Sequence, residues 1–199
     1  MAKVDPHSYA DPEQGRVTRL GLILDVDFRT KRLTGTATLG LEGAKGGHLD
    51  LDTRDLDISG VMGPDGKCLD WEMDPADPVL GSRLRVHLPD GTGNFVVEFA
   101  TSPEASALQW LEPAQTDGGK HPYLFSQCQA IHARSVIPCQ DSPLARLVQL
   151  MGTTLASRHD HPPCIPSSHA CPVGAAERSM PAIRRGGISF KVGVANGQR

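Results

Sequence analysis

Apolar side chains recur at every second position between Leu20 and Phe28, and this alternation constrains the fold more than any other feature of the chain. The recurring positions are Leu20, Leu22, Leu24, Val26 and Phe28. A period of two places all of them on one face of an extended segment. The pattern therefore predicts a β-strand with one buried face.

A second alternation follows the polar turn at residues 29–32. Its apolar members are Leu33, Ala37, Leu39 and Leu41, and its polar members are the threonines at positions 34, 36 and 38. Threonine is β-branched and suits a pleated, half-exposed surface. The two alternating segments predict a β-hairpin.

Further short alternations occur at residues 48–52, 56–59, 83–88 and 95–99, and turn-forming residues 89–93 separate the last two. No stretch before residue 140 keeps a long 3.6-residue period, which argues against α/β folds and helical bundles. Many short strands predict an all-β antiparallel sandwich or saddle. Residues 144–151 have helical spacing over about two turns, and a strand remains open there.

The size and composition predict one folded domain that is soluble and remains in the cytoplasm. The chain has 199 residues, no apolar run long enough to span a membrane and no apolar leader at its start. Five cysteines, none in a C-x-x-C pair, fit a reducing compartment.

The charge distribution divides the chain. Residues 1–140 hold 13 basic and 20 acidic side chains, whereas residues 141–199 hold seven and three. The acidic β-region argues against nucleic-acid binding, which favours a basic face. The change of sign predicts two segments of different character.

The stretches S-A-L-Q-W-L, H-P-Y-L-F-S-Q-C-Q-A-I-H and P-C-Q-D-S-P carry a family resemblance. Together with D-P-H-S-Y-A-D-P-E-Q, L-T-G-T-A-T-L-G-L and L-D-T-R-D-L-D-I-S-G-V upstream, they resemble in order the amino-terminal domain of the leukotriene A(4) hydrolase and aminopeptidase B family. The resemblance covers roughly residues 5–143. It implies a saddle-shaped β-domain that packs against a thermolysin-like zinc peptidase domain, which a helical domain follows.

The resemblance also implies a substrate-contacting segment. Gln127, Cys128, Gln129 and Ala130 correspond to the Q-C-Q-A segment that reaches the substrate cleft in this family. A neutral amide oxygen can accept a hydrogen bond from a peptide's terminal ammonium without adding a buried charge. The plainer interpretation is that two glutamines at alternate positions form the polar face of an edge strand.

Zinc is the cofactor that the resemblance implies, but its ligands are absent from this sequence. The family uses an H-E-x-x-H helix to hold the metal. No histidine of this chain is followed by glutamate, and the G-x-M-E-N element is also absent. We therefore expect a chain cut off before the catalytic domain and inactive alone. In a complete relative the substrate would be a peptide amino terminus or a lipid epoxide.

Several other groups invite a site, and each also has a plainer structural interpretation. Asp50, Asp52, Asp55 and Asp57 alternate with apolar residues and are expected to line a solvated strand face. Cys128 and Cys139 are expected to be buried thiols, and His132 a satisfied structural histidine. The aromatic residues Trp110, Tyr123 and Phe125 are expected in the core.

The resemblance ends near Pro143, so we expect an incomplete β-domain at residues 1–143 and an unrelated, irregular tail at 144–199. Missing strands would leave open sheet edges and apolar surface, which predicts marginal stability and aggregation. An alternative function is a non-catalytic module that binds a protein partner through this surface. A weaker hypothesis is a metal site in the tail, formed by His159, His161, Cys164, His169 and Cys171.

Overall fold

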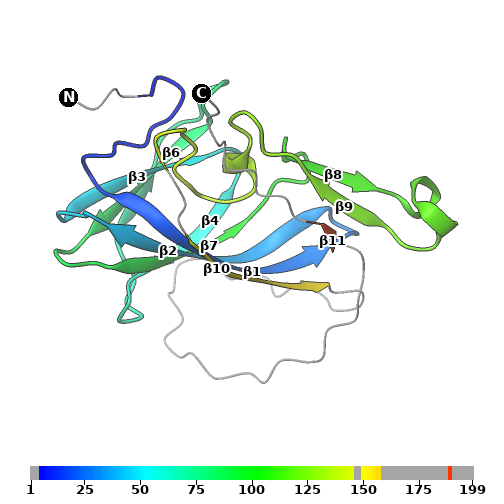
Figure 1. The fold of residues 1–199 in the computed structure, drawn as a ribbon, viewed down its shortest axis with the longest axis horizontal. Coiled ribbons are helices and arrows are strands. Elements are labelled where there is room, and N and C mark those ends of the chain that lie inside the picture. The colour runs from blue at the N-terminus through cyan, green and yellow to red at the C-terminus, as the bar shows by residue number, and fades with distance from the viewer. Residues whose placement is uncertain (1–4, 146–148, 158–187, 190–199) are drawn as a thin grey trace.

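The computed structural model describes residues 5–145, 149–157 and 188–189. Within these ranges the chain forms β-strands and three short 3-10 helices, η1 to η3 (Figure 1). The helices are η1 (Pro113–Gln115), η2 (Asp117–Gly119) and η3 (Ala133–Ser135). The strands are β1 (Arg16–Asp27), β2 (Arg32–Glu42), β3 (Gly47–Thr53), β4 (Asp57–Met62), β5 (Trp71–Met73), β6 (Ser82–Leu88), β7 (Asn94–Ala100), β8 (Leu108–Leu111), β9 (Tyr123–Ser126), β10 (Gln149–Ser157) and β11 (Ile188–Ser189).

The predicted hairpin is confirmed as β1 and β2. The strands pair antiparallel from Asp27 opposite Arg32 to Arg16 opposite Glu42. The side chain of Asp27 closes the turn, because its Oδ1 accepts hydrogen bonds from the backbone N–H groups of Arg29 and Thr30. The predicted apolar face of β1 is buried from Leu20 to Val26.

A five-stranded sheet contains this hairpin, in the order β10-β1-β2-β7-β4. All of its pairs are antiparallel except β10 with β1, which are parallel. The segment at 144–151, for which helix and strand were both open, thus leads into a strand. Within residues 144–199, Gln149–Ser157 forms β10, which pairs with the edge of β1.

Two three-stranded sheets complete the described fold, in the orders β3-β6-β5 and β11-β9-β8. Although β6 and β7 are consecutive, β6 pairs with β3 and β5, whereas β7 pairs with β2 and β4. The turn-forming residues 89–93 therefore connect two different sheets. The all-β, mainly antiparallel fold class is confirmed.

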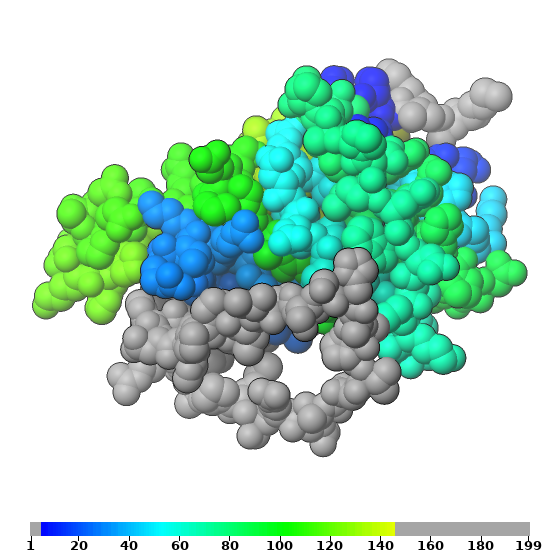
Figure 2. All heavy atoms as spheres, turned by 180° about the vertical axis from the view of Figure 1, so that it is seen from behind, coloured from blue at the N-terminus to red at the C-terminus, as the bar shows by residue number. Residues whose placement is uncertain are grey.

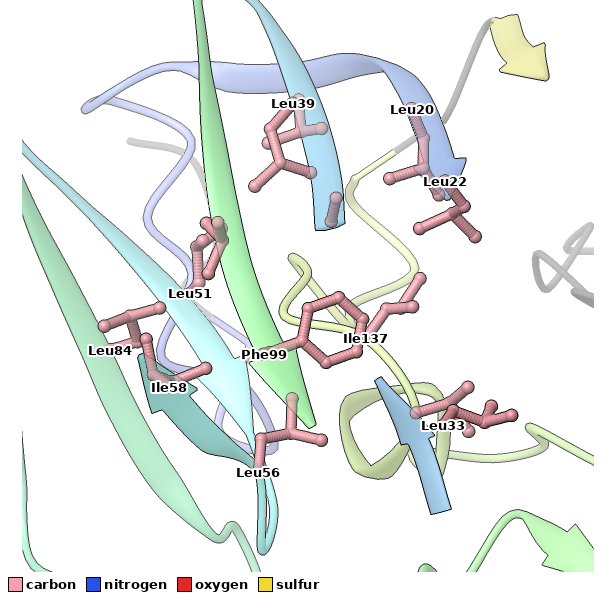
Figure 3. Close-up of a cluster of buried hydrophobic side chains, with 14 of the residues drawn as sticks. Leu20, Leu22, Leu33, Leu39, Leu51, Leu56, Ile58, Leu84, Phe99 and Ile137 are labelled. Carbon is pink, nitrogen blue, oxygen red and sulfur yellow. The ribbon is translucent and has the colours of Figure 1, made fainter. Parts of the chain in front are cut away.

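One hydrophobic core lies between the sheets (Figure 3). It combines Leu22 of β1, Leu51 of β3, Leu84 of β6 and Phe99 of β7, all of them buried. Burying this apolar surface is the main favourable contribution to folding. None of the helices in the described ranges is long and apolar enough to cross a membrane.

Strands β8 and β9 form an arm that projects from the rest of the molecule, with η1 and η2 at its far end (Figures 1 and 2). We call residues 108–126 the β8–β9 arm. An edge-to-face contact between Phe28 and Trp110, with ring centroids 5.4 Å apart, joins the arm to the end of β1. The arm places residues 127–130, which follow β9 directly, beside the core.

Candidate functional site

The sequence-predicted segment Gln127–Ala130 leaves β9 and enters a turn at the base of the β8–β9 arm. Gln127, Gln129 and Ala130 are exposed, whereas the Cys128 side chain between them is 5% exposed and packs in the core. The backbone N–H of Gln127 donates to the carbonyl oxygen of Ala107 at 2.9 Å, which extends the pairing of β8 and β9 by one residue. The side chain of Gln127 therefore continues the exposed face of β9. The two glutamines of the segment are thus at the surface, and the buried side chain of Cys128 between them fixes the segment to the core.

Hydrogen bonds define the path of the segment after Cys128. The backbone N–H of Gln129 donates to Oε1 of Gln127 at 3.2 Å, and that of His132 donates to the carbonyl oxygen of Cys128 at 3.0 Å. The peptide bond between Gln129 and Ala130 is cis. The two glutamines differ in their roles, since the amide oxygen of Gln127 accepts a hydrogen bond within the loop, whereas Gln129 contributes its backbone N–H to that bond and is itself exposed.

Both described free cysteines, Cys128 and Cys139, are unsuited to nucleophilic chemistry. Burial, together with the charge of Asp141, raises the pKa of the Cys128 thiol to about 11. Burial likewise raises the pKa of Cys139. With pKa values raised in this way, both thiols are protonated near neutral pH, whereas the reactive form of cysteine is the thiolate. The expected burial is confirmed for Cys128, whereas Cys139 is half-buried.

A buried ion-pair network lies beside this segment, and the sequence analysis did not predict it. Arg134 has no exposed surface, and its guanidinium lies 3.1 Å from the Asp141 carboxylate and 3.6 Å from that of Asp52. It also donates to the carbonyl oxygens of Leu80 and His7. The charge of a buried arginine requires such partners.

The Asp52 carboxylate extends this network to the start of the chain. It accepts hydrogen bonds from the hydroxyl of Ser8 at 2.6 Å and from the backbone N–H groups of Tyr9 and Asp141. Three of the six sequence stretches that carry the family resemblance therefore meet here. Their polar residues hold the first described residues, β3 and the segment after η3 together.

The prediction that all four alternating aspartates are solvated is wrong for Asp50 and Asp52, which are 3% and 0% exposed. Asp50 forms a bidentate pair with Arg85 at 2.7 and 2.9 Å. Burial raises the pKa of Asp50, but the hydrogen bonds from Arg85 and Gln14 and the charges of Arg85 and Arg83 outweigh it, so the pKa falls below its ordinary value. Alternation sets the face of a side chain, not whether other polar groups cover that face.

The prediction that the three aromatic residues of the β8–β9 arm lie in the core is confirmed only in part. Trp110 packs against the core as expected, and Tyr123 is half-buried. Phe125 is 37% exposed, since it lies on the opposite face of β9 from the buried Leu124 and Ser126. His132, expected to be satisfied, has its ring Nδ1 2.8 Å from the hydroxyl of Ser106.

The described residues do not fit a zinc ion. No group of three or more histidine, cysteine, aspartate or glutamate side chains within the described ranges could hold a metal. The buried carboxylates of Asp50 and Asp52 are used by arginines, and the two free thiols stay protonated. The tail cluster from His159 to Cys171 lies outside the described residues.

Residues 5–147 match the model of the peptidase M1 N-terminal domain. The chain belongs to this family. It is 40% identical over 147 residues to leucine aminopeptidase 2 of Aspergillus oryzae and 40% identical over 146 residues to leukotriene A-4 hydrolase of Xenopus laevis. Each alignment covers 70% of this chain and 24% of the relative.

The fold agrees with the sequence comparison. The structure of native yeast LTA4 hydrolase superimposes with a TM-score of 0.69 and 33% identity, over 78% of this chain and 25% of the yeast chain. The chain thus spans about a quarter of the length of the peptidase M1 relatives that it matches. The expected resemblance and the expected N-terminal domain type are confirmed.

Proposed function

We propose that this chain supplies one wall of the substrate cleft in an aminopeptidase of the leukotriene A-4 hydrolase type. The observation that carries the proposal is the exposed, hydrogen-bonded segment Gln127–Ala130 in a peptidase M1 N-terminal domain. The hydrogen bond from the Gln129 N–H to Oε1 of Gln127 fixes the backbone of the segment, so that little backbone entropy remains to be lost when a substrate binds.

In this proposal Gln129 contacts the substrate and Gln127 supports it. The exposed amide oxygen of Gln129 accepts a hydrogen bond from the terminal ammonium of a peptide. Gln127 holds the backbone of Gln129 through its own amide oxygen. Cys128 anchors the segment in the core, and the small side chain of Ala130 leaves room beside it.

Catalysis in this proposal belongs to residues that the described ranges do not contain. The sequence lacks H-E-x-x-H, and the described residues do not fit zinc. Purified chain with added zinc is expected to leave an alanyl or arginyl chromogenic amide intact. Turnover that a chelator abolishes would contradict this expectation.

A hybrid enzyme tests the cleft assignment. Residues 5–147 of this chain would replace the matching region of the Xenopus laevis hydrolase, and the aminopeptidase activity would be measured. We expect Gln129→Ala to raise KM by about tenfold, which corresponds to the loss of one hydrogen bond to a charged group, with a smaller change in kcat.

The matched control is Gln109→Ala, because Gln109 is also an exposed glutamine but lies on β8. It is expected to leave KM unchanged. Equal effects of the two substitutions, or no effect of Gln129→Ala in an active hybrid, would show that Gln129 does not contact the substrate.

A second candidate function is a non-catalytic module that binds a protein partner in the cytoplasm. The exposed apolar side chains Ile23, Phe125 and Leu144 favour it. Co-purification of the tagged chain with a catalytic relative, lost in Phe125→Ser, would support this function. Recovery of the chain alone from the cytoplasmic fraction would argue against it.

A further inference from the structure

We propose that Ser106 and His132 are positioning residues, which hold the Gln127–Ala130 segment in its exposed conformation. The inference deepens the proposed function, since it names what keeps the substrate-contacting segment in place. Neither residue is proposed to touch the substrate.

The two residues flank the segment in the sequence. Ser106 lies before β8, and His132 lies in the turn that follows Ala130. The hydroxyl of Ser106 and Nδ1 of the His132 ring are 2.8 Å apart, a hydrogen-bond distance. This contact closes the path that begins at Gln127 and ends at His132.

The backbone of the neighbouring Ala107 reinforces the contact on both sides. Its carbonyl oxygen accepts from the N–H of Gln127 at 2.9 Å, at the start of the segment. Its own N–H donates to the hydroxyl of Ser135 at 3.1 Å, and that hydroxyl donates to the carbonyl oxygen of His132 at 2.8 Å. Residues 106 and 107 thus hold both ends of the loop 127–135.

The exposure of Ser106 indicates that its hydroxyl restrains the loop and does not contribute to the packing of the core. Ser106 is exposed, so its side chain adds nothing to the apolar packing. Cys128 anchors the segment in the core, and the backbone N–H of His132 donates to its carbonyl oxygen, so these contacts hold the turn at 129–132 from the side of the core. The Ser106–His132 hydrogen bond restrains that turn from outside.

Hydrogen exchange of the full 199-residue chain tests the inference directly. We expect Ser106→Ala and His132→Ala each to speed exchange of the backbone amides at 127–132 by about two- to tenfold, the range for one exposed hydrogen bond. Amides of β3 and β6 are expected to keep their rates. Ser106→Thr retains the hydroxyl and is expected to restore slow exchange.

Ser102→Ala is the matched control. Ser102 lies in the same connection, and its hydroxyl accepts from the N–H of Glu104 without touching the loop. In the Ser102→Ala variant, the backbone amides at 127–132 should exchange at the same rate as in the unaltered chain. Unchanged exchange in Ser106→Ala, failure of Ser106→Thr to restore it, or faster exchange throughout the chain would each overturn the proposal.

The hybrid enzyme separates this proposal from the proposed function. We expect Ser106→Ala to raise KM with little change in kcat, and to add nothing further in a Gln129→Ala background, because both act through the same contact. If Gln129→Ala leaves KM unchanged, the cleft assignment fails while the exchange result still decides the positioning role. If Gln129→Ala raises KM and Ser106→Ala does not, the positioning role for binding is wrong.

Discussion

At the scale of single residues, Arg134 is a charged side chain that is buried beside the β-sheets because polar groups surround its guanidinium. Its side chain is fully buried, and five polar groups from four residues surround the guanidinium. An arginine suits this position because its planar fork can donate several hydrogen bonds at once. Burial raises the pKa of Asp141, in the same network, above its ordinary value despite the hydrogen bonds and the charge of Arg134.

Replacing Arg134 is therefore expected to destabilise the fold strongly. Arg134→Met would leave the carboxylates of Asp52 and Asp141 buried without a counter-charge, at a cost of about 3–5 kcal/mol in the free energy of unfolding. Urea denaturation measures the change. Arg29→Ala, which removes an exposed pair with Asp27, should change the free energy by less than about 0.5 kcal/mol. A similar small loss in Arg134→Met would show that the network is dispensable.

Asp50 gives a prediction that depends on pH. Its pKa in the folded chain is lowered, so the pairing with Arg85 stabilises the fold above the ordinary aspartate pKa of about 3.9 and is lost as pH falls through the folded value. Asp50→Asn should cost about 1–3 kcal/mol at pH 7 and progressively less toward pH 3. Chemical denaturation across this range measures it. Asp57→Asn, on an exposed site, should have little effect at either end, and a constant deficit for Asp50→Asn would contradict the assignment.

At the scale of elements, the β1–β2 hairpin depends on a close backbone approach. Gly35 lies opposite Leu24, and a Cβ at this position would overlap the carbonyl oxygen of Ile23. The clash is with backbone, so no side-chain movement can relieve it.

Gly35→Ala is accordingly expected to destabilise the hairpin by about 1–3 kcal/mol, through forced displacement of β1 from β2. Thermal unfolding followed by circular dichroism measures the loss. Gly93→Ala is the control, because a Cβ there meets no atom within 4 Å and the backbone is not in the left-handed region. If the two variants melt together, the close approach does not constrain the hairpin.

At the scale of the whole molecule, exposed apolar side chains remain on the described surface. Ile23 is 55% exposed on the outer face of the five-stranded sheet, and Leu144 is 44% exposed. A sheet face that carries an exposed isoleucine favours contact with a second chain. The strand β10 covers one edge of this sheet but does not remove the exposed face.

The purified chain is therefore expected to self-associate as its concentration rises, which sedimentation velocity would detect. Ile23→Thr should reduce the association, because threonine keeps the β-branched shape and adds a hydroxyl. Val79→Thr is the control, since Val79 is also exposed but lies in the connection before β6. A monomer at all concentrations, with one cooperative unfolding transition, would refute the prediction.

The sequence by itself determined the strands whose residues alternate strictly, and the family. The period of two from Leu20 to Val26 places these side chains on one face in any strand, so the buried face of β1 follows from local geometry. The ordered stretches from S-A-L-Q-W-L to P-C-Q-D-S-P likewise identified the domain type, and with it the segment at Gln127.

Tertiary structure alone decided which polar residues are buried and which strands pair. Asp52 and Asp57 occupy similar positions in alternating stretches, yet one meets Arg134 in the core and the other meets solvent. The contact between Ser106 and His132 and the assignment of β6 and β7 to separate sheets depend in the same way on distant segments. Alternation constrains a residue only relative to its own strand, whereas burial and pairing depend on what the rest of the chain places against it.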